Sequence, residues 1–425
     1  MKISKKGWGY YILFIVTILL WYQLFYLIAF PQSIDNILKI DNFMPIVSFI
    51  SLFLLIILLV TKNKIIKKYN DFFSYIYWLI FAVLLLVVYS ILKYPEQSIF
   101  TTFKIGISFL VIIFSVPVLL MLEKSKYTVL VWKIINLVAF LWYMVIIIQT
   151  IYYSKYGLFL FDFWTYFQRY FNQGQYGLRI SLHAFGNIMV LYNLVNLYYK
   201  RGLIKFWHMM NFIVGISALI FIQQTRALYV YLAICIMCII LKNKNKKLIS
   251  KITIMFFIIY VLIFTDFIPS FISSFSIYGD NSISTEARIY SIQYYFMCFL
   301  RNPIFGNGLA DGYEESVYAF IEHGPLGIAY YSDIGFIGLL ANTGIFSLVI
   351  LVWPIARLIK QYKITKEYMA DNQRDFMFIS IIYLIITSFT YLITESKNAI
   401  LFPILIGYFE YYTLKVRLEN GEIKL

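Results

Sequence analysis

Three arginines stand where an apolar run meets a polar segment, and each is suited to holding a phosphate group. Arg179 lies in GLRISLHAFGN before one run, Arg226 lies in IQQTRAL between two runs, and Arg288 lies in STEARIY ahead of an amphipathic stretch. A guanidinium is always charged and presents a planar fork of donors that matches phosphate oxygens. The alternative for each is an arginine that only reaches the lipid headgroups.

Three neighbouring residues are candidates for a general base, because a carboxylate or an imidazole can take a proton from a hydroxyl group. Asp333 begins a long apolar run and is the first choice, and Glu322 and His323 follow in IEHGPLG. A nearby arginine would keep Asp333 ionised and limit its basicity. The alternatives are that Asp333 caps the helix after it and that His323 is an ordinary loop histidine.

Asp162 and Trp164 are candidates for binding a sugar, through hydrogen bonds and ring stacking. The alternative is an aromatic anchor at a membrane interface. Cys235 and Cys238 form a C-x-x-C within an apolar run, where they are expected to pack as small hydrophobes. Since the chain has three cysteines, a disulfide framework is excluded.

The composition requires a membrane to position these residues. Of 425 residues, 61% are hydrophobic, 13% are charged and 20% are aromatic. Soluble globular proteins carry about twice that charged fraction, so this class is excluded. Apolar runs long enough to cross a bilayer predict an all-α polytopic integral membrane protein with about twelve transmembrane helices. The predicted spans are 8–30, 43–61, 73–92, 102–122, 129–151, 181–199, 207–223, 227–241, 252–268, 333–355, 376–393 and 399–414.

The net charge of +15 is explained by topology. Basic clusters occur in every second connection, which predicts that both termini are cytoplasmic. This arrangement puts 26 of the 36 Lys and Arg and 8 of the 21 Asp and Glu inside. The excess of positive charge therefore orients the helices, and binding of nucleic acid has no support. Five of the nine arginines, including the three above, fall on the outer side.

Residues 1–425 are expected to form a single transmembrane domain with two long external loops, at 152–180 and 269–332. Long loops in compact proteins are usually functional. In the larger loop, Ser284 or Thr285 can cap a helix that Pro303 ends. An apolar stripe formed by Ile289, Ile292, Phe296 and Phe299 predicts an amphipathic helix resting on the membrane.

Four segments resemble the O-antigen polymerase and ligase superfamily, whose members are membrane glycosyltransferases. The segments are GLRISLHAFGN (177–187), TRA (225–227), STEARIY with RNPIFGNG (284–308), and DIGFIGLLANTGIFSLVI (333–350). The likeness covers about residues 150–350. It implies a GT-C-like architecture and a glycan carried on undecaprenyl pyrophosphate, with Arg179, Arg226 and Arg288 holding the pyrophosphate.

At one position this sequence differs from the members of the superfamily that resemble ligases. Members that resemble ligases carry a His-Asn pair about eleven residues before the glycine of the closing A-x-x-G pattern, which here is Gly344. That position holds Asp333, followed by Ile334. The missing histidine favours a polymerase over a ligase.

The resemblance further implies metal-independent, inverting glycosyl transfer at the outer face of the cytoplasmic membrane, without a metal or another cofactor. The implied partners are the undecaprenyl-pyrophosphate-linked oligosaccharide, membrane lipids, a chain-length regulator and a flippase. The product would be O-antigen, capsule or another exopolysaccharide. The rival functions are a ligase and a flippase or transporter of the lipid-linked oligosaccharide. Transporters usually show internal repeats and charges within the membrane, and we find no convincing repeat in this sequence.

Overall fold

A computed structural model describes residues 8–21, 40–61, 64–125, 128–160, 171–174, 177–180, 184–223, 226–242, 282–312, 316–389 and 399–419. The helices of the first half are α1 (Trp8–Trp21), α3 (Ile40–Val60), α4 (Lys64–Lys68), α5 (Asn70–Lys93), α6 (Ile99–Phe109), η3 (Leu110–Phe114), α7 (Ser115–Ser125), α8 (Thr128–Tyr156), α10 (Ala184–Tyr199) and α11 (Gly202–Ala218).

The second half continues with η5 (Leu219–Gln223), α12 (Arg226–Lys242), α15 (Ser282–Arg301), α16 (Ala319–His323), η6 (Tyr331–Ile334), α17 (Phe336–Thr343), η7 (Gly344–Phe346), η8 (Leu348–Val352), α18 (Trp353–Thr365), α19 (Asp371–Thr387) and α20 (Leu401–Glu419). The described residues also form one antiparallel hairpin, in which β1 (Phe171–Gly174) pairs with β2 (Gly177–Ile180). The predicted fold class is therefore right for the helical body, and the hairpin is an addition that the sequence did not suggest.

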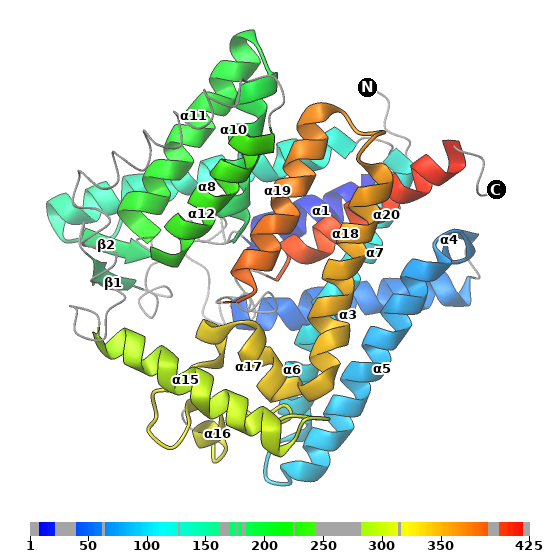
Figure 1. Ribbon diagram of the computed structural model, residues 1–425, viewed down its shortest axis with the longest axis vertical. Helices are drawn as coiled ribbons and strands as arrows, with labels where there is room; N and C mark the ends of the chain where they lie inside the picture. Colours follow the sequence, from blue (N-terminus) through cyan, green and yellow to red (C-terminus); the bar gives the residue numbers. More distant parts are fainter. Residues whose placement is uncertain are drawn as a thin grey trace.

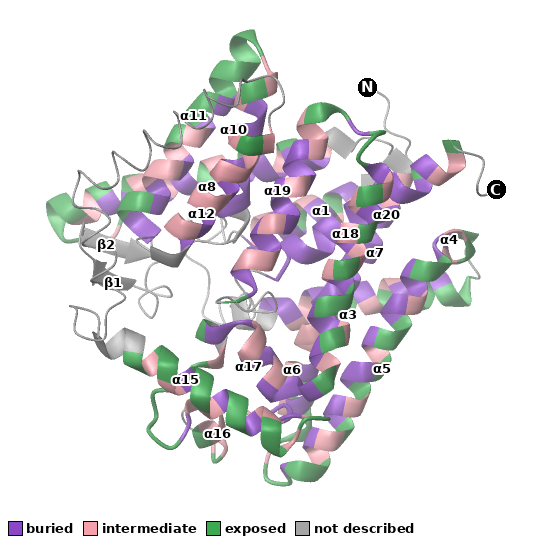
Figure 2. Cartoon of the chain, viewed as in Figure 1, coloured by how far each residue is buried: buried purple, intermediate pink, exposed green. Residues whose placement is uncertain are grey.

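The core lies where the C-terminal helix packs against the middle of the chain. Nearly every residue of α20 from Leu401 to Val416 is buried. Trp132 of α8 contacts Phe376 of α19 and Tyr408 of α20 edge to face, with ring centroids 4.8 and 5.3 Å apart. In Figure 2 buried residues follow α7 and α20 through the centre, and exposed residues lie along outer helices such as α5 and α11.

Many exposed side chains of the outer helices are large and apolar, as expected for surfaces that face lipid. Phe49 and Phe53 on α3 and Trp78 and Phe81 on α5 are each more than half exposed. Among the described residues, five helices are long and apolar enough to cross a membrane. They coincide with the predicted spans 43–61, 73–92, 102–122, 129–151 and 207–223.

The predicted span 333–355 differs from expectation because it is not one helix. Two helical pieces, Phe336–Phe346 and Leu348–Thr365, meet at an angle of 111°. α17 ends at Thr343, and the next residue, Gly344, has a φ of 56°, a conformation that a glycine adopts without strain. If this bent pair counts as one span, the described residues contain up to six spans. The predicted span 252–268 lies outside the described residues.

Polar contacts join α10, α12, α18 and α19 at one end of the molecule, which we call the basic end. Lys242 Nζ on α12 lies 2.9 Å from Asp375 Oδ1 on α19 and donates to the hydroxyl of Tyr362 on α18. The hydroxyl of Tyr199, at the end of α10, donates to Asp375 Oδ2 over 2.6 Å. The basic clusters were predicted to share one side of the membrane. These contacts agree with that arrangement.

The long helix α5 connects the basic end to the opposite end. It begins at Asn70, beside the basic residues of α4, and its 24 residues span about 36 Å. In Figure 1 α15, α16 and α17 lie to the left of the lower end of α5. We call this second region the loop end. The candidate functional residues described below lie there.

Candidate functional site at the loop end

Two of the motifs found in the sequence are bound to each other. The turn at 302–308 follows α15 and packs against the break after α17. Asn307 N donates to Ala341 O over 2.7 Å, and Gly308 N donates to Asn342 O over 2.9 Å. Ile345 N donates back to Pro303 O over 3.0 Å. A side chain at Gly306, where φ is 63°, would overlap Ala341 O. The RNPIFGNG and ANTG motifs thus form one rigid junction.

The end of α5 holds the chain that follows this junction. Ser90 Oγ accepts from Leu309 N over 2.8 Å. Gln97, just beyond α5, accepts from Asp311 N over 2.9 Å and donates to Leu309 O over 2.9 Å. Tyr94 and Lys93 both donate to the carbonyl oxygen of Asn307. Sequence reasoning missed these positioning residues, because they lie more than 200 residues from the loop that they hold.

The helix α15 covers the loop end and confirms that a helix precedes Pro303. It begins at Ser282, two residues before the expected cap at Ser284. Its buried side carries Ser291, Tyr295 and Cys298. The predicted apolar stripe points the other way, because Ile289, Ile292 and Phe296 are each at least 40% exposed. That stripe is therefore available to lipid, as a helix resting on the membrane requires.

Tyrosines of α15 fix the short helix α16, which carries two of the candidate bases. The Tyr294 hydroxyl donates to Ile321 O over 3.0 Å, and the Tyr295 hydroxyl donates to Glu322 O. Both side chains of interest, Glu322 and His323, are therefore attached to a fixed backbone. Sequence periodicity did not reveal this role of the tyrosines, because it concerns a contact between separate elements.

Glu322 is the candidate base with the most perturbed environment. Its carboxylate is packed against Gly312, where a methyl group would overlap Glu322 Oε2. Burial, together with the nearby carboxylate of Asp311, raises the pKa of Glu322 to about 8. A carboxylate with a pKa near neutrality is a stronger base than an ordinary one. Asp311 is a second functional candidate that the sequence did not single out.

His323 lies next to Glu322 and has one ring nitrogen fixed. Nε2 lies 3.1 Å from Gly312 O, a distance at which the N–H donates to the carbonyl oxygen. When Nε2 carries the donated hydrogen, Nδ1 is the ring nitrogen that can accept a hydrogen bond. Nδ1 is buried and has no hydrogen-bond partner among the described residues. The ring also meets Tyr330 edge to face at 5.4 Å.

Asp333, the first choice from the sequence, has a different environment. It lies in η6 and is exposed, and its backbone N–H donates to Tyr330 O over 3.3 Å. It does not cap α17, because the residue before that helix is Gly335 and no side chain caps it. The alternative role weighed for Asp333 is therefore not observed.

The structure describes the side chain of only one of the three candidate arginines. Arg288 is exposed on α15. Arg179 lies on β2 opposite Asn172, and Arg226 is the first residue of α12; the side chains of these two lie outside the described structure. β2 contacts η5, the element that ends three residues before Arg226. In Figure 1 the hairpin and the first turns of α12 and α15 all lie at the left of the view.

The candidate sugar-binding residues Asp162 and Trp164 lie outside the described residues, as do 269–281 of the larger loop. Within the described part, no three His, Cys, Asp or Glu side chains are grouped so that they could hold a metal ion. The site as described therefore consists of an acid-base cluster, Asp311, Glu322 and His323, held by α5 and α15.

Comparison with known proteins gave a family match for the central part of the chain. Residues 211–352 match the family model described as O-antigen ligase. The matched residues make up about a third of the chain. The match confirms the predicted place in the O-antigen polymerase and ligase superfamily. A search of curated proteins gave no significant match.

The matched region, residues 211–352, contains most of the loop end. It extends from α11 to η8 and includes Arg226, Arg288, Glu322, His323 and Asp333. The positioning residues of α5 and the hairpin with Arg179 lie before it. Together with the apolar helices, the family match identifies the chain as a membrane protein.

Proposed function

We propose that this protein is a polysaccharide polymerase of the cytoplasmic membrane, with both termini cytoplasmic. It joins oligosaccharide repeat units carried on undecaprenyl pyrophosphate at the outer face, in the synthesis of O-antigen, capsule or another exopolysaccharide. The observation that carries the proposal is the O-antigen ligase match at 211–352, which coincides with the acid-base cluster and two of the three candidate arginines. Asp333, at the place of the ligase histidine, favours polymerisation over ligation.

In the proposed reaction, a hydroxyl oxygen of the acceptor sugar attacks the anomeric carbon of the donor sugar. The carboxylate of Glu322 takes the hydroxyl proton. The bond from the anomeric carbon to the pyrophosphate oxygen breaks, and undecaprenyl pyrophosphate leaves with the electron pair. Attack opposite the leaving group inverts the anomeric centre, and no metal is required. The negative charge that develops on the leaving oxygen is stabilised by Arg179, Arg226 and Arg288.

Among the three candidate bases, Glu322 is preferred over Asp333 on structural grounds. Its raised pKa of about 8 suits proton abstraction, and α16 is fixed by two hydrogen bonds from α15. His323 is the second choice, because its buried Nδ1 is an available acceptor. Asp333 is exposed and therefore less well placed to act in a water-poor site.

The first experiment replaces the arginines one at a time by alanine and measures surface polysaccharide length in cells. Arg179→Ala, Arg226→Ala and Arg288→Ala are each expected to abolish long chains while single repeat units still reach the outer leaflet. Arg301→Ala is a matched control, since this exposed arginine ends the same helix, α15. If the lipid-linked unit stays on the cytoplasmic side in the variants, the protein is a flippase and the proposal is wrong.

The ligase alternative is supported by the description of the matching family. A ligase transfers a finished chain to another acceptor, so its loss leaves long chains attached to undecaprenyl pyrophosphate. Loss of a polymerase leaves single units. Gel analysis of the lipid-linked pool in a deletion strain therefore separates the two functions. Long lipid-linked chains in that strain contradict the polymerase proposal.

A further inference from the structure

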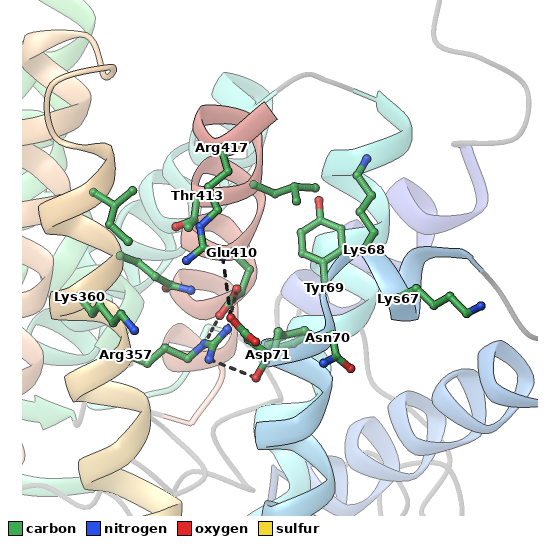
Figure 3. Close-up of a pocket in the computed structure, with 14 residues that line it drawn as sticks. Lys67, Lys68, Tyr69, Asn70, Asp71, Arg357, Lys360, Glu410, Thr413 and Arg417 are labelled. Carbon is green, nitrogen blue, oxygen red and sulfur yellow. Dashed lines mark hydrogen bonds and ion pairs between the residues drawn. The ribbon is translucent and has the colours of Figure 1, made fainter. Parts of the chain in front are cut away.

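A cavity at the basic end, far from the loop end, is lined by charged side chains. It lies between the start of α5, the middle of α18 and the last turns of α20, and its volume is about 210 Å³. Figure 3 shows Arg357 and Lys360 of α18, Glu410, Thr413 and Arg417 of α20, and Asp71 of α5 around it. Lys67 also lines the cavity, but its side chain extends away from this group.

The charges of this group are only partly compensated. Arg357 is bound to Glu410 by two hydrogen bonds, and its Nη1 donates to Asp71 O over 3.2 Å. Arg417 Nη1 lies 3.8 Å from Asp71 Oδ2, and the Asp71 side chain is 71% exposed. Such exposed pairs contribute little to stability. Lys360 has no ion pair among the described residues. Lys360 is therefore available to hold an anion, and Arg417 can do so because its long pair with the exposed Asp71 is weak.

Two buried polar atoms at the cavity lack a partner. Gln361 Oε1 and Thr413 Oγ1 make no hydrogen bond within the described part of the chain. The two residues are only 4% and 6% exposed. Leaving such groups unpaired is costly, so an unpaired buried polar group indicates a bound water, ion or ligand. The Thr413 hydroxyl can donate to an anion, and so can the amide of Gln361 once its nitrogen and oxygen are exchanged.

We propose that this cavity binds a phosphate group. Lys360 and Arg417 supply the charge, and Thr413 and Gln361 supply uncharged donors. The cavity has several times the volume that one water occupies, about 30 Å³, so it has room for a tetrahedral anion with its first waters. The group belongs either to an anionic phospholipid headgroup or to a soluble phosphate compound, since both present the same oxygens. The site lies at the opposite end of α5 from the acid-base cluster, and the inference does not depend on the proposed function.

The test uses the full-length protein in nanodiscs. In one arm the nanodiscs contain phosphatidylcholine alone and inorganic phosphate is added at constant ionic strength, with chloride as the reference. In the other arm phosphatidylglycerol replaces part of the phosphatidylcholine. The readout in both arms is the midpoint of thermal unfolding. The variants are Lys360→Gln, Arg417→Gln and Thr413→Val. The matched control is Lys363→Gln, an exposed lysine of α18 that does not line the cavity.

The wild type and Lys363→Gln are expected to be stabilised in one of the two arms. Stabilisation by inorganic phosphate identifies a soluble ligand, and stabilisation only by phosphatidylglycerol identifies a lipid headgroup. Lys360→Gln and Arg417→Gln each weaken the apparent affinity by about tenfold, as the loss of one charge-assisted hydrogen bond predicts. Thr413→Val, which keeps its volume, weakens it less. The proposal is overturned if neither arm stabilises the wild type, or if Lys363→Gln has the same effect as Lys360→Gln. Water alone then fills the cavity.

Discussion

Replacing Glu322 by glutamine is expected to make the protein more stable and to abolish its activity. Glutamine has nearly the shape of a protonated glutamate and cannot take a proton. Folding raises the pKa of Glu322 from 4.5 to about 8, because burial disfavours the charged carboxylate. Between these two pH values the unfolded chain releases a proton that the folded chain keeps. The free energy of unfolding therefore keeps the full contribution of Glu322 below about pH 4.5. It loses this contribution as the pH rises to about 8.

The size of this effect follows from the pKa values. Each pKa unit corresponds to about 1.4 kcal/mol, so the whole loss is about 5 kcal/mol at high pH. At pH 7 the loss is about 3 kcal/mol, and at pH 5.5 it is about 1 kcal/mol. Glu322→Gln has no such titration. The variant is thus expected to be more stable than the wild type, by a margin that grows with pH.

The assay compares the midpoints of thermal unfolding of the two proteins in nanodiscs from pH 5.5 to 8.5. Glu286→Gln is the matched control, since Glu286 is exposed on α15, and it should leave the pH dependence unchanged. In the same proteins, polymer formation should rise with pH through about 8 in the wild type and be absent in Glu322→Gln. A stability difference that is equal at pH 5.5 and 8.5 refutes the reasoning from burial. Full activity of Glu322→Gln refutes the assignment of the base.

Three further substitutions test neighbouring features. Gly312→Ala should displace the flexible Glu322 carboxylate, changing the unfolding midpoint little and lowering the polymerisation rate by about tenfold or more; an unchanged rate contradicts the packing of Glu322 against Gly312. Asp311→Asn removes a nearby negative charge, so the rise of activity should move to lower pH, which a pH-rate profile measures. Arg357→Gln leaves the buried carboxylate of Glu410 without its cation and should lower the free energy of unfolding by about 3 kcal/mol; unchanged denaturation curves argue against that pair.

The sequence by itself determined the class of the protein and the positions of its main elements. Apolar runs of transmembrane length predict helices without tertiary information, because a segment in lipid must make its backbone hydrogen bonds internally. Five of the predicted spans coincide with long apolar helices. The helix α15 before Pro303 was also predicted, and so was the superfamily, which the match at 211–352 confirmed.

Only the tertiary structure decided how these elements meet. Hydropathy averages over a window, so it does not reveal the 111° bend between Phe346 and Leu348 within an apolar run. The raised pKa of Glu322 also comes from the tertiary structure, because burial and the nearby Asp311 cause it and neither is a property of the local sequence. The anchors on α5 and the cavity of the basic end join residues more than 200 positions apart. Such contacts arise from packing, and no local pattern in the sequence encodes them.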